Sequence, residues 1–152
     1  MATQLMKDWI VELHNPDRDQ TTGQLGREDL EGNRSHCCLG VLCEVSGLTA
    51  QKREEYDHED NLSGFYLRYD GSDSLAPYNV ISDLFDLEPS VYEDNVLLVS
   101  DFDENGLQVY ADRANDELGW SFHQIASVLI DEYLTPEEAF EVRKRIEDNG
   151  WV

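Results

Sequence analysis

The stretch RSHCCLGVLCEVSGL, residues 34–48, determines how the rest of the chain is interpreted. From residue 37 to residue 45 nearly every side chain is apolar or small. A helix that is apolar on most sides is buried on most sides, so this segment predicts a central helix. We expect Ser35 to be its N-cap and Gly47 its C-terminal glycine. Gly40, inside the helix, costs about 1 kcal/mol relative to alanine, and the close approach of a neighbouring element would offset that cost.

The same stretch contains all three cysteines, Cys37, Cys38 and Cys43. Structural zinc sites favour cysteine pairs spaced by two to four residues, with a second pair elsewhere. Here two cysteines are adjacent, and the chain has no second pair. Free cysteine is among the most buried residue types, so we expect these thiols to fill space in the core.

One cysteine has a possible chemical role. Cys37 is expected at the start of the helix beside Arg34 and His36, where a thiol pKa is lowered. A Cys-dependent hydrolase would require His123 and Asp116 to converge on that thiol. Nothing in the sequence brings these residues together, and the acidic surroundings oppose thiolate formation.

Outward from this stretch, apolar periodicity predicts an α+β fold that is rich in helix, with a small antiparallel sheet or hairpins, in one domain over residues 1–152. The segment 107–117 reads as a helix or as a strand running into one. The remaining predicted elements are helices at 2–15, 78–87, 121–134 and 135–150, a hairpin at 64–77, a strand at 94–102, and loops at 16–33 and 49–64, with a short strand near 20–25 in the first loop.

Charge is the main signal in the composition. The chain has 33 Asp and Glu against 11 Lys and Arg, which gives a net charge of -22. Such a field repels phosphates and acidic membranes, so neither nucleic acid nor a membrane is an expected direct partner. A solvated acidic surface, recognition of a basic partner, and mimicry of a nucleic acid remain open. The sequence shows neither a signal peptide nor an apolar run long enough to span a membrane, which favours a cytoplasmic location.

The segment DFDENGLQVYAD, residues 101–112, resembles a calcium loop. Asp101, Asp103, Asn105 and Asp112 fall at positions one, three, five and twelve of that pattern, with glycine at position six. The closing ligand is Asp in place of Glu, and Gln108 occupies position eight, where the pattern has an apolar residue. An Asn-Gly hairpin turn among solvated acids is the competing interpretation, and beyond this possible calcium site we expect no cofactor.

A ligand pocket is the last candidate. A helix N-terminus offers free N–H groups to an anion, and basic residues there are unusual in so acidic a chain. The alternative is that Arg34 pairs with nearby acids and that Ser35 only caps the helix. The predicted site for an anionic or nucleotide-like ligand comprises Gln24, Arg27, Arg34, Ser35, His36, Asn115 and Asp116.

Several phrases, HCCLGVLCEV above all, resemble a widespread family of small proteins of tailed bacteriophages and prophages. The others are KDWIVELHN, TTGQLGR and ANDELGWSFHQIASVLIDEYL, and their order and approximate spacing match over most of the chain. The resemblance implies a phage or mobile-element origin, and residues 135–152 resemble a C-terminal helical extension. Small phage proteins often bind host factors or nucleotide signals, so the expected compartment is the host cytosol.

Together these observations predict a small accessory protein that acts by non-covalent binding and not by catalysis. It would inhibit or sequester a host protein or a small anionic, nucleotide-like ligand. An acidic nucleic-acid mimic that blocks a DNA-binding protein is the alternative, and a Cys-dependent hydrolase is a third hypothesis.

Overall fold

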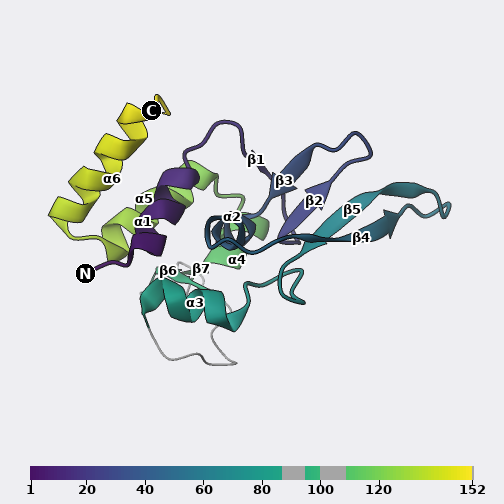
Figure 1. The fold of residues 1–152 in the computed structure, drawn as a ribbon, viewed down its shortest axis with the longest axis horizontal. Helices are drawn as coiled ribbons and strands as arrows, with labels where there is room; N and C mark the ends of the chain where they lie inside the picture. The colour runs from purple at the N-terminus through teal and green to yellow at the C-terminus, as the bar shows by residue number, and fades with distance from the viewer. Residues whose placement is uncertain (87–94, 100–108, 152) are drawn as a thin grey trace.

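The computed structural model describes residues 1–86, 95–99 and 109–151 (Figure 1). The described residues contain six helices: α1 (Gln4–Glu12), α2 (Cys38–Val45), α3 (Tyr78–Phe85), α4 (Ala111–Asp116), α5 (Phe122–Tyr133) and α6 (Pro136–Asp148). They also contain seven strands: β1 (Asp19–Gln20), β2 (Gly26–Glu28), β3 (Arg34–His36), β4 (Gln51–Tyr56), β5 (Leu62–Arg68), β6 (Leu97–Val99) and β7 (Val109–Tyr110). The predicted α+β class is confirmed.

Strands β1 to β5 form one mixed sheet in the order β1-β3-β2-β5-β4. β1 runs parallel to β3, and the other neighbours are antiparallel. β6 and β7 form a separate antiparallel pair. In Figure 1 the helices gather on one side of the molecule, and the β4–β5 hairpin projects from the other side.

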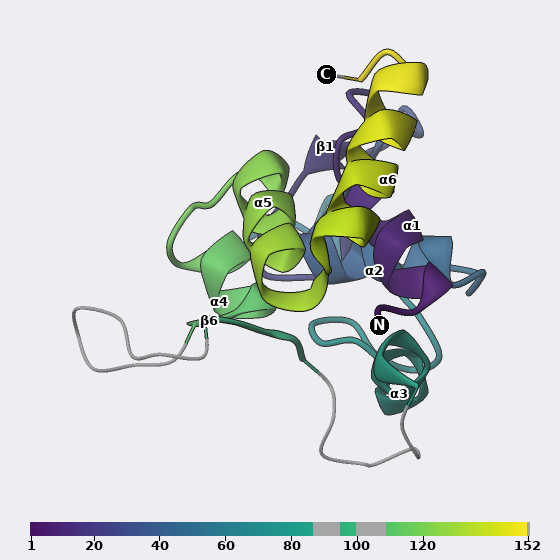
Figure 2. The same cartoon turned by 90° about the vertical axis from the view of Figure 1, so that its left-hand side faces the viewer.

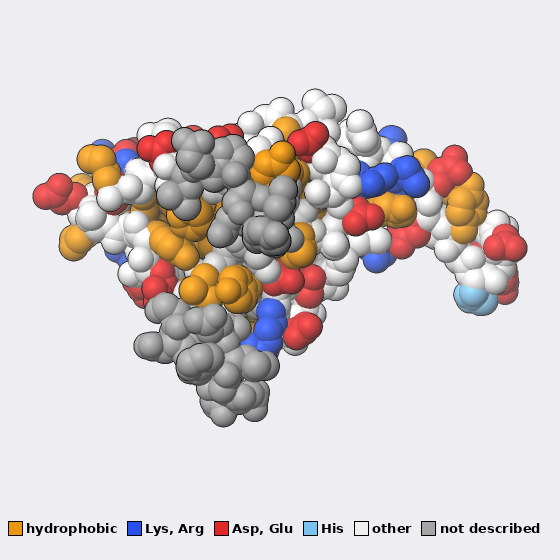
Figure 3. Space-filling model, turned by 90° about the horizontal axis from the view of Figure 1, so that it is seen from below, with side chains coloured by type: hydrophobic (Ala, Val, Ile, Leu, Met, Phe, Trp, Pro, Cys, Tyr) orange, Lys and Arg blue, Asp and Glu red, His pale blue; other side chains and the backbone are white. Residues whose placement is uncertain are grey.

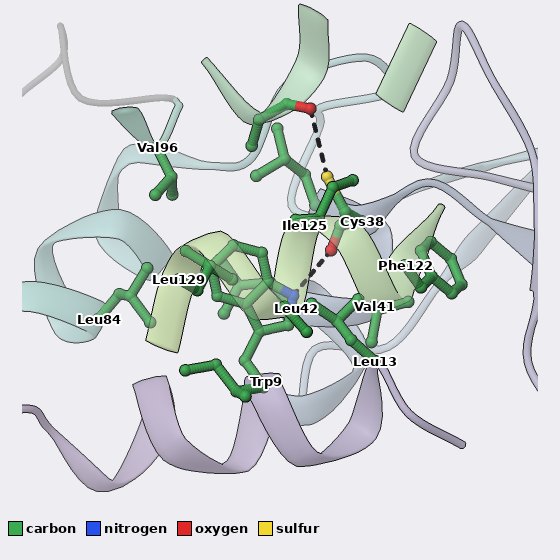
Figure 4. Close-up of a cluster of buried hydrophobic side chains, with 14 of the residues drawn as sticks. Trp9, Leu13, Cys38, Val41, Leu42, Leu84, Val96, Phe122, Ile125 and Leu129 are labelled. Atoms are coloured by element: carbon green, nitrogen blue, oxygen red, sulfur yellow. Dashed lines mark hydrogen bonds between the residues drawn. The ribbon is translucent and has the colours of Figure 1, made fainter. Parts of the chain in front are cut away.

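The core lies where α1, α2 and α5 meet (Figure 4). The indole N–H of Trp9, which is fully buried, donates to the carbonyl of Cys38 at 2.9 Å. The thiol of Cys38 in turn contacts the carbonyl oxygen of Ala111 at 3.4 Å. The central apolar stretch therefore forms the buried helix that its composition predicts, and its cysteines pack as small apolar groups.

The start of α2 differs from the prediction. Residues 34–36 form strand β3 and not the lead-in to a helix, and the N-cap is Cys37, whose sulfur accepts from the N–H of Gly40. The prediction that Ser35 caps the helix is therefore wrong. Short polar runs carry little strand propensity of their own, and β3 exists because it pairs with strands on both sides.

Gly40 allows the close approach that its place in the helix predicts. A Cβ built on this residue would lie 1.8 Å from the carbonyl oxygen of Leu25. That same carbonyl accepts from the N–H of Cys37 at 3.1 Å, which fixes its position at the start of α2. Helix α2 therefore contacts the backbone at the entry of β2 directly, and this contact sets the sheet against the helices.

The charged segment 49–64, predicted to be a loop, is the other large difference. Its first half is strand β4, which pairs with β5 along most of its length, and Asp57 closes the turn between them by accepting from the N–H groups of Glu59 and Asn61. The predicted turn at residues 70–71 is present only as a small bridge between Tyr69 and Ser72. The charged alternation of β4 suits a strand that is solvated on both faces, so no apolar stripe marks it.

The remaining helices follow their local signals. Ser121 with Gln124, and Thr135 with Glu138, form the predicted capping boxes of α5 and α6. In the described part of segment 107–117, strand β7 is followed directly by helix α4. Figure 2 shows α6 lying along α1, and Glu138 of α6 accepts from the backbone N–H of Ala2 at 2.8 Å.

Candidate functional site

One face of the five-stranded sheet carries a continuous row of polar side chains. Pairing places Asp19 opposite Ser35, Ser35 opposite Arg27, Arg27 opposite Tyr66, and Tyr66 opposite Arg53. Directly opposed residues in a sheet point to the same face, so these five side chains form one row across all five strands. We call this surface the arginine face.

Arg68 belongs to the same surface. It lies two residues after Tyr66 on β5, and alternate residues of a strand share a face. Three of the eleven Lys and Arg residues, Arg27, Arg53 and Arg68, are therefore grouped on one side of the sheet. Figure 3 shows Lys and Arg side chains gathered along the projecting arm, among acidic ones. These three cations therefore share one face in a chain of net charge -22.

The hydrogen bonding of these arginines is incomplete. Arg27 pairs with Glu55 at 3.1 Å, and Arg68 donates to the carbonyl of Gly71 at 2.7 Å. In both residues the Nε atom is buried and has no hydrogen-bond partner among the described residues. Within that part of the chain Arg53 makes no ion pair, and it is exposed. Buried unpaired donors are rare in native proteins, and an anion or water is the usual reason for one.

A shallow cavity of about 330 Å³ adjoins part of this face, and Arg53, Tyr66 and Arg68 do not line it. It is lined by Arg27, Arg34 and Ser35 of the sheet and by Glu55 and Gly64 of the hairpin. A Cβ at Gly64 would lie 2.8 Å from the carbonyl oxygen of Glu28, so glycine allows the two backbones to approach closely here. A polar, open cavity of this kind suits a hydrophilic ligand more than an apolar one.

Arg34, the neighbour of Ser35 in β3, points to the opposite face by strand alternation. There its Nε donates to Glu28 at 2.9 Å, and Lys52 donates to the second oxygen of Glu28 at 2.7 Å. These bonds hold the pKa of the Glu28 carboxyl below its usual range. Arg34 is therefore paired with a nearby acidic side chain, as the second of the two interpretations of this residue predicts.

His36 is buried, at 4% exposure. Its Nε2 lies 3.2 Å from Glu44 of α2 and 3.1 Å from the hydroxyl of Tyr69. The contact with His36 holds the pKa of Glu44 below its usual range, while burial raises the pKa of Tyr69. This network joins sheet to helix, so the structure does not bring His36 to the arginine face.

Asn115 is likewise a structural residue. At 1% exposure, its Oδ1 accepts from the N–H of Cys38 at 3.2 Å and from Gln20 at 2.8 Å. Its Nδ2 donates to the carbonyl of Thr21 and to Asp116, both at 2.8 Å. Asn115 therefore connects α4 to the start of α2 and to β1, and all of its polar atoms have partners. The role of Gln20, which also accepts from Phe122 N, was not predicted.

The predicted set therefore divides. Arg27, Arg34 and Ser35 line the same cavity, although Arg34 is paired with Glu28, whereas His36, Asn115 and Asp116 do not line it. Gln24 is half-buried, and its Oε1 has no partner among the described residues. Sequence reasoning missed Arg53, Tyr66 and Arg68, because their grouping depends on strand register and no short motif encodes it.

Burial suppresses thiol chemistry at α2. It raises the pKa of Cys37 to about 12, and it raises those of Cys38 and Cys43 as well. The thiolate is the nucleophile, so Cys37 is unreactive near neutral pH in this structure. Asp116 lies close enough to raise the Cys37 pKa further, which is the opposite of what a hydrolase requires.

We expect Ellman's reagent to label none of the three thiols in the native protein at a pH of about 8, and all three after denaturation in guanidinium chloride. The absorbance of the released thiolate anion measures both states. Fast labelling of even one thiol before unfolding would contradict the buried arrangement of α2.

The predicted calcium loop lies mostly outside the described residues. Asp101, Asp103 and Asn105 are not described, and Asp112 lies in the first turn of α4, where it accepts from the side-chain amide of Asn95. Among the described residues, no group of three or more His, Cys, Asp or Glu side chains is placed to hold a metal ion. No described helix combines the length and apolarity needed to cross a bilayer.

Comparison with known families gives one match. Neither the curated proteins nor the solved structures contain a chain that matches this one. Residues 1–133 match a family described as a domain of unknown function, DUF8296, so that α6 lies outside the matched region. The match spans α1 to α5 and includes the arginine face, and the chain therefore belongs to the DUF8296 family.

Proposed function

We propose that this protein is a binding protein that holds a small, nucleotide-like anion on its arginine face. The observation that supports the proposal is the pair of buried, unpartnered Nε donors of Arg27 and Arg68 on one open side of the sheet. Leaving such donors unpaired costs about 1–3 kcal/mol each, and a bound oxyanion would remove that cost.

Phosphate is the oxyanion that the donor set fits best. The guanidinium fork presents paired donors in a plane, which suits bidentate contact with phosphate oxygens. Arg53 is exposed and unpaired among the described residues, so its donors are available without breaking a contact. Arg27 is held by Glu55 at 3.1 Å, and a ligand would compete with that exposed pair.

The position of Tyr66 favours a nucleotide over inorganic phosphate. Its ring lies between Arg27 and Arg53 in the cross-strand row and is half-buried. An aromatic ring on a sheet face offers a stacking surface to a base, worth about 1–3 kcal/mol per base. The overall negative field opposes a long polyanion, so the proposed ligand is small. In the phage setting that the sequence resemblance implies, the role would be sequestration of such a ligand.

Isothermal titration with ATP, inorganic phosphate and adenosine tests this proposal. We expect ATP to bind more tightly than phosphate, and adenosine to bind only weakly, because base stacking and charge act together. Arg53→Gln should weaken ATP binding by about tenfold, equivalent to about 1.4 kcal/mol, without loss of stability, since Arg53 is exposed on an edge strand.

Lys144→Gln is the matched control, because it removes one charge from an exposed position of helix α6, on another part of the molecule. It should leave ATP binding unchanged. If ATP does not bind the wild-type protein at low ionic strength, or if both variants lose affinity equally, the arginine face is not a nucleotide site.

A further inference from the structure

A second cleft lies among the helices, on a different part of the molecule. It has a volume of about 310 Å³ and opens where the end of α1 meets α5 and α6. Ile130 of α5 and Ile146 of α6 supply buried apolar walls, and the indole of Trp151 adds a half-buried aromatic one. Mostly apolar clefts with a few convergent polar groups are the usual form of small-molecule sites, and this volume is at the small end of their range.

Two imidazole rings form one edge of the cleft. His14 and His123 are stacked, with ring centroids 4.9 Å apart and 28° between their planes. Nδ1 of His14 lies 2.9 Å from the carbonyl oxygen of Ile10. A carbonyl can only accept, so this nitrogen carries a proton, and Nε2 is the atom left to gain or lose one. The stack presents a flat surface to a planar molecule.

Arg143 supplies a fixed positive charge to the same cleft. It is exposed on α6, and among the described residues it has neither an ion-pair nor a hydrogen-bond partner for its guanidinium. Glu147 lies one turn further along α6 and also lines the cleft, yet the two side chains do not pair. The charged and titratable groups that line the cleft beside His14 are therefore His123 from α5 and Arg143 and Glu147 from α6.

We propose that this cleft binds a small planar aromatic carboxylate, and that it does so more tightly as the pH falls. The aromatic ring would lie against Trp151 and the stacked imidazoles, and the carboxylate would accept from Arg143. The proposal does not depend on the arginine face, because the two sites share no residue.

The pH dependence follows from the charges in the cleft. Burial lowers the pKa of His14, and the adjacent His123 lowers it further, while the contact with Ile10 opposes the shift. Without a ligand His14 is therefore neutral at neutral pH. A bound anion favours the charged form of His14, so binding takes up a proton and affinity rises as the pH falls. The carboxylate of Glu147, which also lines the cleft, opposes the bound anion by its negative charge.

Titration with naphthalene-2-carboxylate, followed by ¹H–¹⁵N NMR of the tryptophan indole groups, tests the proposal. The indole of Trp151 should shift, whereas that of Trp9, which is buried in the core and donates to Cys38, is the internal reference. We expect binding to be about tenfold tighter at a pH of about 5.5 than at about 7.5. A Trp151 resonance that does not respond to the ligand at the lower pH would overturn the proposal.

Variants separate the charge from the pH response. Arg143→Gln should weaken binding by about tenfold at both pH values, and His14→Gln should remove most of the pH dependence. Lys144→Gln, on the same helix, should change neither the affinity nor its pH dependence.

Naphthalene-2-carboxamide, the neutral analogue, should bind without a pH dependence. Equal losses in the Arg143 and Lys144 variants would show a general field effect in place of a site, and ATP binding in the Arg143 variant should be unchanged.

Discussion

Gly40→Ala is expected to lower the free energy of unfolding by more than about 4 kcal/mol, the range in which single substitutions are exceptional. The new Cβ would lie 1.8 Å from the carbonyl oxygen of Leu25, a backbone atom that cannot rotate away. To relieve the clash, α2 must withdraw from the sheet, and the hydrogen bond from Cys37 N to the same carbonyl would break. Urea unfolding followed by circular dichroism measures the loss.

Gly26→Ala is the matched comparison within the same contact region. There the closest atom to a new Cβ would be the flexible end of Leu67, at 2.9 Å. Overpacking of that kind costs about 1–3 kcal/mol, less than a backbone collision. If the Gly40 variant were as stable as the Gly26 variant, the direct contact between α2 and the entry of β2 would be wrong.

Asn115→Ala is expected to cost about 3 kcal/mol or more, because it leaves the buried N–H of Cys38 and the buried carbonyl of Thr21 without partners. The amide of Gln20 would lose one acceptor as well. The defect should be concentrated at the start of α2 and at β1, so hydrogen exchange at the Cys38 amide should accelerate together with the loss of global stability.

Asn61→Ala provides the control, since Asn61 is exposed at the tip of the hairpin. Surface substitutions of this kind change stability by less than about 0.5 kcal/mol. A loss at Asn115 no greater than the loss at Asn61 would show that the buried amide does not connect α4 to the rest of the fold.

Local signals in the sequence predicted the helices well. The capping boxes of α5 and α6 are formed by residues three apart, and their hydrogen bonds depend on nothing further along the chain. Gly40 was informative for a related reason, because a glycine inside a helix is costly and so indicates that something approaches it.

Pairing between distant segments was not predictable from the residues that form it. Residues 34–36 are a strand because they lie between β1 and β2, and residues 51–56 are a strand because they pair with β5 at the edge of the sheet. The arginine face could not be predicted for the same reason, because it depends on how the strands pair. Arg27, Tyr66 and Arg53 become neighbours only when the register of three strands is known. Asn115 was predicted to contact a ligand, but its side-chain atoms are all bonded within the fold.

Strand β4 forms the outer edge of a sheet that extends away from the helices, and its free backbone groups are the kind that recruit strands from other molecules. Alternation places Lys52 and Glu54 on one side of this strand and Arg53 and Glu55 on the other. An incoming strand would have to strip water from charges on both sides at once. The projecting hairpin can therefore remain solvent-facing at high concentration without seeding aggregation.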